Sequence, residues 1–143
     1  WPIVIMLGAM IPIGQALEST GITALIATEV VSLAGDLHIF WILMIILIIT
    51  MLITDVINNA ATAVIMAPFS VNIALQLGQP LEPFLMVVAV GASCAFLTPI
   101  GHQCNTLVMG PGNYKFSDYW RLGLPLDILI VLASIPMILF VWL

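Results

Sequence analysis

Charged side chains are scarce in this sequence, and basic ones are the scarcest. Lys115 and Arg121 are the only basic residues besides two histidines, and charged residues make up 6% of the 143. A nucleic-acid-binding surface needs clustered Lys and Arg, so that class of function is excluded. Soluble domains carry about 25% charged residues, whereas 63% of this chain is hydrophobic. The composition therefore predicts an all-α membrane protein whose partner is the lipid bilayer.

Cysteine is also sparse, with only two residues. Cys94 lies in an apolar run and Cys104 in a polar segment, without CxxC or Cys/His spacing, so the sequence predicts no disulfide, zinc site or other cofactor. The chain starts at Trp1 inside an apolar run that lacks a basic flank. We therefore expect no signal peptide there, and interpret the chain as a piece of a longer, transporter-sized protein.

Two polar breaks interrupt the apolar runs. Residues 54–62 (TDVINNAAT) contain Asp55, Asn58 and Asn59, and residues 98–105 (TPIGHQCN) form the second break. Within hydrocarbon, backbone that is not helical must find partners inside the protein or line a cavity, and an ionisable residue there is functional by default. We expect a re-entrant-type helical hairpin with its tip at 54–62, facing the loop of a broken helix at 98–105.

The order of the runs resembles half of a transporter. Pairs of interrupted hydrophobic segments are the best sequence pointer to a transporter's binding site.

Lys115 and Arg121 lie in loop 113–121, which the positive-inside rule places in the cytoplasm, with the C-terminus outside. The predicted elements are a span over 1–17, a short helix over 21–33, helices over 39–53, 60–77 and 83–97, a half-helix over 106–109, an interfacial segment over 115–121 and a final span over 123–143.

The breaks carry groups suited to ions. Helices beginning at Asn59/Ala60 and at Asn105/Thr106 would point backbone N–H groups and a positive dipole end at an anion. Carbonyl groups near Ile57 and Gly101 could coordinate sodium, because oxygen-only ligation suits a hard cation.

Several of these residues have a second interpretation. Asn58 and Asn59 could simply form hydrogen bonds between helices, and Asp55 could be either a structural anchor or an ion ligand. His102 could titrate a proton, donate to a substrate, or be a loop residue with a local partner. An intramembrane enzyme using Asp55 and His102 as acid and base is disfavoured, because no nucleophile or metal cluster accompanies them.

Taken together, these segments resemble the divalent anion:sodium symporter (DASS) family, within the ion transporter superfamily that also includes citrate and arsenite carriers. Residues 1–21 resemble the start of the second half of those transporters. Residues 54–60 stand where the family has an acidic residue followed by a Ser-Asn-Thr signature, and 98–105 stand at the loop of its broken helix. Residues 110–112 and 123–126 match the run into its last helix.

The resemblance implies an inverted repeat of five-helix halves, a homodimer, an elevator-type movement, and two sodium sites beside one divalent anion. Residues 1–143 would be the second, C-terminal repeat, paired with an N-terminal repeat of the same protein. Asn59 matches the central Asn of the signature, which contacts substrate and sodium. Thr54 and Gly101 match positions of the second sodium site.

The sequence departs from the family pattern at four positions. Asn58 and Ala60 replace the Ser and Thr of the signature, which removes a substrate hydroxyl contact. His102 and Gln103 stand where dicarboxylate carriers usually have Thr and Pro. The PIGHQ form resembles the branch that often carries TrkA-C domains and is linked to sulfate-type uptake.

We therefore predict a secondary active transporter, not an enzyme, that carries a sulfate-like divalent anion by cation-coupled symport in a bacterial-type inner or plasma membrane. Sodium is the expected coupling ion, with a proton as the alternative. Rival interpretations are a dicarboxylate or citrate-type carrier, and a non-transporting subunit or degenerate half. The predicted substrate-binding residues are Asn58, Asn59, Ala60, His102, Gln103, Asn105 and Thr106, and the predicted sodium-binding residues are Thr54, Ile57, Asn59 and Gly101.

Overall fold

The computed structural model describes residues 12, 16, 19–21, 25, 28–29 and 38–143. Among these residues every regular element is helical and no strand occurs, which confirms the all-α prediction. The predicted span over 1–17 and short helix over 21–33 fall mostly on residues outside this set, and they stay predictions. The helices from residue 38 onward are α3 (Ile39–Thr54), α4 (Asn59–Leu77), α5 (Leu81–Ala92), α6 (Gln103–Met109) and α7 (Phe116–Trp142).

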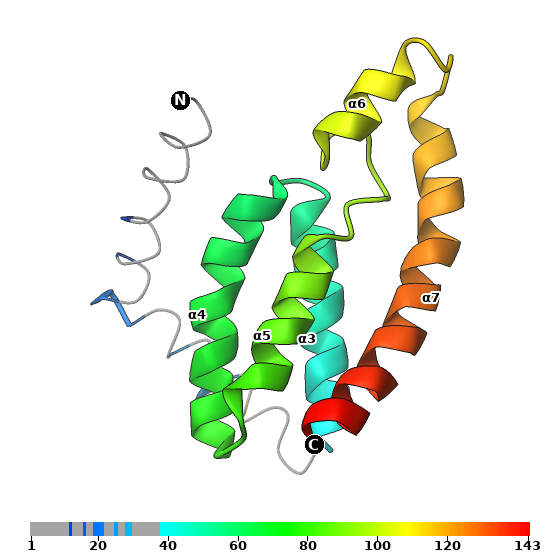
Figure 1. Cartoon of the computed structure of the whole chain (residues 1–143). Helices are drawn as coiled ribbons and strands as arrows, with labels where there is room; N and C mark the ends of the chain where they lie inside the picture. The colour runs from blue at the N-terminus through cyan, green and yellow to red at the C-terminus, as the bar shows by residue number, and fades with distance from the viewer. Residues whose placement is uncertain (1–11, 13–15, 17–18, 22–24, 26–27, 30–37) are drawn as a thin grey trace.

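Helices α3 and α4 form a helical hairpin, lying side by side and joined at one end (Figure 1). Its re-entrant character stays a prediction. The buried residues of α3 recur at helical spacing along one stripe: Ile42, Leu43, Ile46, Leu47, Thr50, Met51 and Thr54. Helix α4 starts after Asn58, whose side chain caps it, and ends at Gly78 in the left-handed region (φ 63°). Glycine at this C-terminal position avoids the steric cost of a Cβ.

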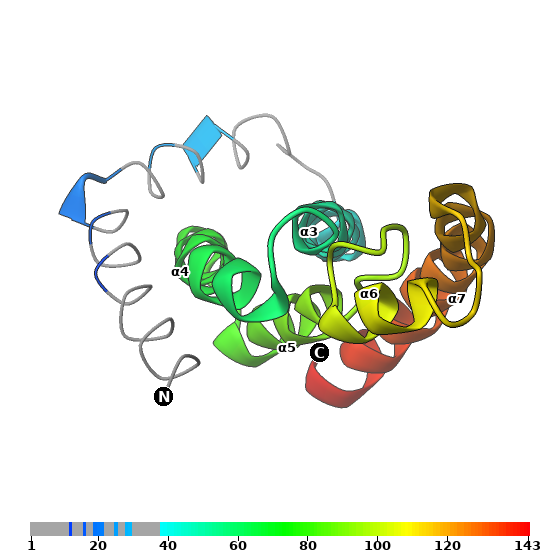
Figure 2. The same ribbon diagram turned by 90° about the horizontal axis from the view of Figure 1, so that it is seen from above.

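Helix α5 packs against both arms of the hairpin (Figure 2). Phe84 and Val87 of α5 are fully buried with Leu47 of α3 and Ile73 of α4. The approach to α3 is close because Gly91 has no side chain, since a Cβ there would lie 2.9 Å from the Thr50 Cβ. A small residue at position 91 is therefore what lets α5 and α3 pack closely.

Helix α5 ends at Ala92, five residues earlier than the predicted end at Leu97. Proline favours a helix end just before it, which places the predicted end near Pro99, but the backbone is already irregular from residue 93 to 102. Twelve residues rise only about 18 Å, whereas the hydrocarbon core is about 30 Å thick. Helix α5 alone is therefore too short to cross a bilayer.

Helices α6 and α7 also differ from the predicted bounds. Helix α6 begins at Gln103 instead of Thr106, and α7 is continuous from Phe116 to Trp142, without a separate interfacial segment. The Asp118 carboxylate caps α7 by accepting a hydrogen bond from the Lys115 backbone N–H (2.8 Å), a favourable place for an acid at a helix N-terminus. At 27 residues α7 is about 40 Å long.

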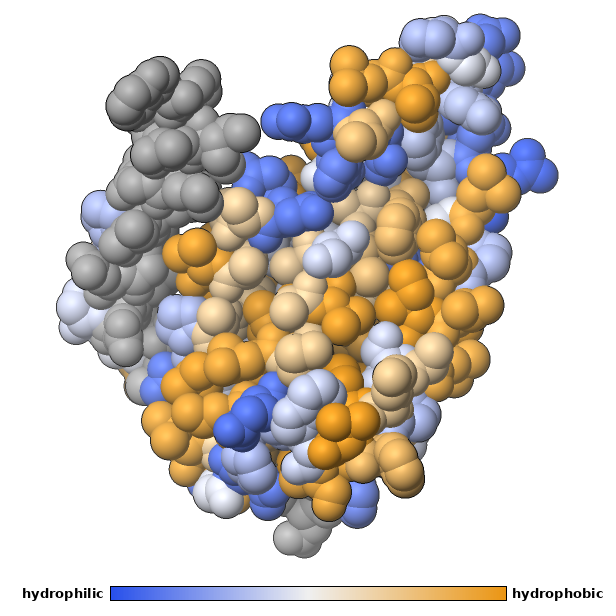
Figure 3. All heavy atoms as spheres, in the orientation of Figure 1, coloured by the Kyte–Doolittle hydropathy of each residue, from blue (hydrophilic) through white to orange (hydrophobic). Residues whose placement is uncertain are grey.

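On the face of the molecule that Figure 3 shows, hydrophobic residues cover much of the surface of the helices. Among the described residues, α4 and α7 are long and apolar enough to cross a membrane. On α3 the face away from the core is also apolar and exposed, at Ile45, Ile48, Ile49 and Leu52. A continuous apolar exterior of this extent needs lipid or further protein to cover it, which fits a membrane protein.

Candidate functional site

The two polar breaks lie in direct contact. One carboxylate oxygen of Asp55, Oδ1, accepts a hydrogen bond from the Leu97 backbone N–H (3.0 Å), and the Asp55 carbonyl accepts one from the Thr98 hydroxyl (2.6 Å). The Thr54 hydroxyl contacts the Ala92 carbonyl at 2.9 Å, where α5 ends. The structure therefore joins the hairpin tip to the broken-helix loop, and it gives Asp55 an anchoring role between them.

Side chains also take the place of helical hydrogen bonds within the broken segment. The Asn105 amide donates to the carbonyls of Ala95 (2.8 Å) and Thr98 (3.2 Å), and the Thr106 hydroxyl donates to the Pro99 carbonyl (2.6 Å). Buried backbone polar groups must be paired, and these bonds satisfy them where the helix has stopped. Asn105 and Thr106 thus hold the shape of the loop.

Gly101 is the point of closest backbone approach between the breaks. A Cβ at this buried residue would lie 2.8 Å from the Thr54 carbonyl oxygen and 3.0 Å from the Asp55 Cα. Its φ angle lies outside the left-handed region, so space and not backbone conformation requires glycine here. Thr54 and Gly101, both predicted to bind sodium, are consequently neighbours.

The first turn of α4 presents polar groups at the same junction. The Thr54 Oγ1 and Asn59 Oδ1 atoms are 3.0 Å apart, and the Asn58 side chain caps the helix by accepting from the Ala61 N–H (2.9 Å). The N–H groups of Asn59 and Ala60 have no hydrogen-bond partner in the described part of the chain, as expected at a helix start. Two donors and a positive dipole end are therefore available at the hairpin tip.

The second break does not offer the free N–H groups that were predicted. The backbone N–H groups of Asn105 and Thr106 donate to the His102 carbonyl (3.0 and 3.4 Å), because α6 already begins at Gln103. The His102 ring caps α6, its Nδ1 accepting from the Cys104 N–H (3.2 Å). The prediction of a helix N-terminus at Asn105 is therefore wrong, and His102 is exposed with a local partner.

Ile57 and Gln103 are both exposed, with 37% of the Ile57 residue surface accessible. The Ile57 N–H donates to the Ile53 carbonyl (2.8 Å), which continues the helical hydrogen bonding of α3 into the tip. Exposure leaves the main chain at the tip open to a ligand, although the side chain of Ile57 brings no ligating atom.

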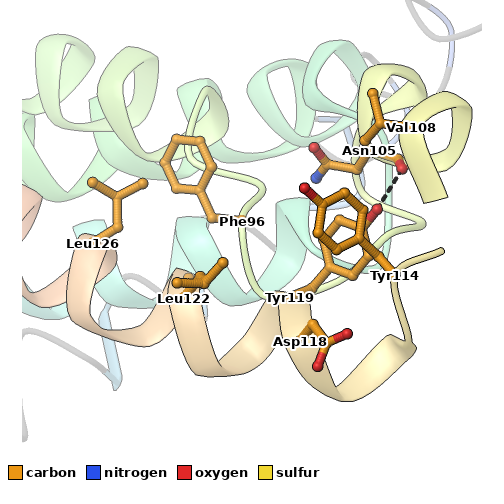
Figure 4. A pocket seen from close by; sticks show the side chains of 9 residues that line it. Phe96, Asn105, Val108, Tyr114, Asp118, Tyr119, Leu122 and Leu126 are labelled. Carbon is orange, nitrogen blue, oxygen red and sulfur yellow. Dashed lines mark hydrogen bonds between the residues drawn. The ribbon is translucent and has the colours of Figure 1, made fainter. Parts of the chain in front are cut away.

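Sequence reasoning did not foresee that α7 braces the second break. The Tyr119 hydroxyl donates to the Asn105 carbonyl (2.7 Å), as Figure 4 shows. A Cβ on Gly123 of α7 would lie 2.5 Å from the Phe96 carbonyl oxygen. Tyr119 lies in the segment 115–121 that was predicted to be interfacial, and nothing in its sequence context signals a partner 14 residues away. A cavity of about 280 Å³ separates α6 from α7, lined by Phe96, Asn105, Val108, Tyr114, Asp118, Tyr119, Leu122, Gly123 and Leu126.

Comparison with known proteins places the whole chain in one family. The family model described as citrate transporter (CitMHS) matches residues 1–143. The chain is 40% identical over 138 residues to the uncharacterized transporter YfbS of Escherichia coli, covering 96% of this chain and 23% of that protein. It is 36% identical over 142 residues to the uncharacterized transporter sll0640 of Synechocystis, covering 99% of this chain and 23% of that protein.

Relatives named for their substrates also match. Sodium/sulfate cotransporter 2 of Chlamydomonas reinhardtii is 27% identical over 135 residues, which is 94% of this chain and 15% of that protein. The sodium-dependent high-affinity dicarboxylate transporter 3 of Caenorhabditis elegans is 30% identical over 125 residues, 86% of this chain and 22% of that protein. The chain thus spans less than a quarter of the length of these curated relatives, which are transporters and not enzymes. It belongs to the citrate transporter (CitMHS) family of DASS-type ion transporters.

Proposed function

We propose that this chain is part of a secondary active transporter that moves a sulfate-like divalent anion together with a cation by alternating access. The observation that carries this proposal is the hydrogen-bonded junction of the two polar breaks, which places unpartnered N–H groups and oxygen atoms side by side. The sodium/sulfate cotransporter among its relatives supports the choice of anion and cation.

The anion would bind at the first turn of α4. The N–H groups of Asn59 and Ala60 supply two donors there, and the exposed Asn58 lies beside them. An oxyanion at a helix N-terminus gains both hydrogen bonds and a favourable dipole. From the second break, His102 and Gln103 would line the same site, because their side chains are exposed.

Asn105 and Thr106 would act on this site mainly by holding the loop. Their side chains are committed to backbone carbonyls of the broken segment. Replacing either would leave buried carbonyl groups unpaired, which costs free energy and loosens the loop.

The coupled cation would bind on the other side of the junction. Thr54 Oγ1 and Asn59 Oδ1 are 3.0 Å apart, and Gly101 packs against the Thr54 carbonyl. Main-chain carbonyls of Ile57 and Gly101 would complete a set of oxygen ligands, which suits sodium. A proton is the alternative coupling ion.

In the whole protein, residues 1–143 would form the C-terminal repeat of an inverted pair, within a homodimer in a bacterial-type inner or plasma membrane. Residues 113–121, predicted as a loop but including the first turns of α7, would face the cytoplasm, with the C-terminus outside. Two rival functions are specific enough to test. The first is a dicarboxylate carrier, which the Caenorhabditis elegans relative favours. The second is a non-transporting subunit or a degenerate half of a transporter.

The test is uptake of radiolabelled sulfate and succinate into proteoliposomes that contain the full-length protein carrying this chain, with and without a sodium gradient. Asn59→Ala should abolish uptake, whereas the matched Asn72→Ala should not, because Asn72 lies far along α4 and its amide donates to the Pro68 carbonyl of the same helix (2.9 Å). Sodium-independent sulfate uptake would contradict sodium coupling, and succinate uptake alone would favour the dicarboxylate carrier. No uptake of either anion by folded protein would refute the substrate assignment.

A further inference from the structure

Asp127 is a buried acidic side chain that the proposed anion and sodium sites do not use. It lies in the interior of α7, and only 8% of the residue is exposed. Its Oδ1 atom is buried and has no hydrogen-bond partner within the described residues. An ionisable side chain in a membrane-spanning helix is costly and points to a function.

The Asp127 side chain lies against a cavity of about 280 Å³ between α3 and α7. Its other lining residues are all apolar: Ile48, Met51, Leu52, Leu97, Leu124, Ile128, Val131 and Leu132. Asp127 is therefore the only lining residue that carries an ionisable group. An ionised carboxylate in such surroundings needs a partner of opposite charge, or it pays a large desolvation cost.

The titratable groups that face Asp127 supply no positive charge. Two titratable groups interact electrostatically with Asp127: the carboxylate of Asp55, which follows α3, and the thiol of Cys94, which follows α5. The sequence of α3 contains no titratable residue, and the one acid of α5, Glu82, lies in its first turn at the opposite end. Asp127 consequently faces a like charge and apolar groups.

A metal ion does not suit this cavity. Sodium or another hard cation takes several oxygen ligands, but the lining side chains offer only the carboxylate of Asp127. No group of three or more His, Cys, Asp or Glu residues in the described part of the chain could hold a metal. A proton needs just one carboxylate oxygen, and the neutral acid that results is compatible with apolar walls.

We propose that Asp127 is a proton-binding site, neutral while α7 packs against α3 and ionised only when the cavity admits water. This role in the transport cycle rests on the proposed function, but the presence of the protonated carboxyl does not. The proton would be bound in addition to sodium, at a position separate from the junction of the two breaks.

The first test uses the unmodified full-length protein in its membrane and the apolar reagent dicyclohexylcarbodiimide. A protonated carboxyl adds across the C=N bond: its oxygen bonds to carbon, its proton moves to nitrogen, and the adduct rearranges to an N-acylurea. Mass spectrometry should find one reagent molecule on Asp127 and none on Asp118, an acid in the first turn of the same helix. Labelling should fall about tenfold for each pH unit above the titration midpoint. Absent labelling, labelling independent of pH, or protection by sodium at constant pH would each overturn the proposal.

The second test measures sulfate exchange in proteoliposomes without a pH gradient, because sulfate itself is a dianion throughout the neutral pH range and does not titrate there. Exchange by the wild type should fall as the pH rises, whereas Asp127→Asn, a mimic of the neutral acid, should exchange at a rate independent of pH. The proposal would be overturned if the Asp127→Asn variant keeps the wild-type pH profile of exchange. It would also be overturned if the folded variant exchanges no sulfate at all. If the wild type does not exchange sulfate at all, the proposed function fails, and the labelling result still decides whether Asp127 holds a proton.

Discussion

Replacing Gly101 by alanine would force the two polar breaks apart. The added Cβ would meet the Thr54 carbonyl oxygen at 2.8 Å, the Ala95 Cβ at 2.9 Å and the Asp55 Cα at 3.0 Å. Non-bonded carbon contacts are comfortable at about 3.5 Å or more, so the junction must open by about 0.5 Å or more. Two of the three obstructing atoms belong to the backbone and cannot rotate away, which makes the opening unavoidable.

The cost of this overpacking is about 1–3 kcal/mol. If the cation site needs Thr54, Asn59 and Gly101 in contact, that cost appears as weaker sodium binding. A coupling of this size corresponds to about a 5- to 150-fold change in affinity. The half-saturating sodium concentration for sulfate uptake should rise by a factor in this range, and the thermal unfolding temperature of the purified protein should fall.

Gly110→Ala provides the matched control, because no atom lies within 4 Å of a Cβ at Gly110 and its φ angle is −67°. This variant should keep the wild-type sodium dependence and unfolding temperature. Gly101→Ala with unchanged sodium dependence and an unchanged unfolding temperature would refute the reasoning, because it would mean that the close junction is not maintained in the working protein.

Two further substitutions test the hydrogen bonds that hold the junction. Asp55→Ala should lower the unfolding free energy by about 1–3 kcal/mol, because the Leu97 N–H is left unpaired. Asp55→Asn keeps an acceptor oxygen for this N–H and should lower the unfolding free energy by less. If thermal unfolding shows equal losses for the two variants, Asp55 binds an ion and is not a structural anchor. Tyr119→Phe removes the hydroxyl that donates to the Asn105 carbonyl and should lower the stability of α6 by about 1 kcal/mol. Backbone amides of α6 should then exchange hydrogen faster than in the wild type. Unaltered exchange would show that α7 does not brace this helix.

The sequence by itself determined the class of protein and the position of the interruptions. A chain with so few charges has to place its helices in hydrocarbon, and apolar runs of sufficient length define α3 and α4 within one residue at each end, whereas α7 begins seven residues before the predicted final span. Asn58 and Gly78 mark the ends of α4 because a side-chain cap and a left-handed residue are local requirements. Local rules of this kind can be read from neighbours in the chain.

Tertiary structure decided where α5 stops and how the second break is shaped. Pro99 suggested an end near Leu97, yet the helix ends at Ala92, where side chains from the hairpin tip replace the helical hydrogen bonds. The partners of Asp55 are 42 and 43 residues away, and no local pattern specifies such pairs. The packing of the helices decides which carbonyl groups find hydrogen-bond donors. It also decides at which position only a glycine fits and which acidic side chain lies in an apolar cavity. Packing is a property of the assembled chain.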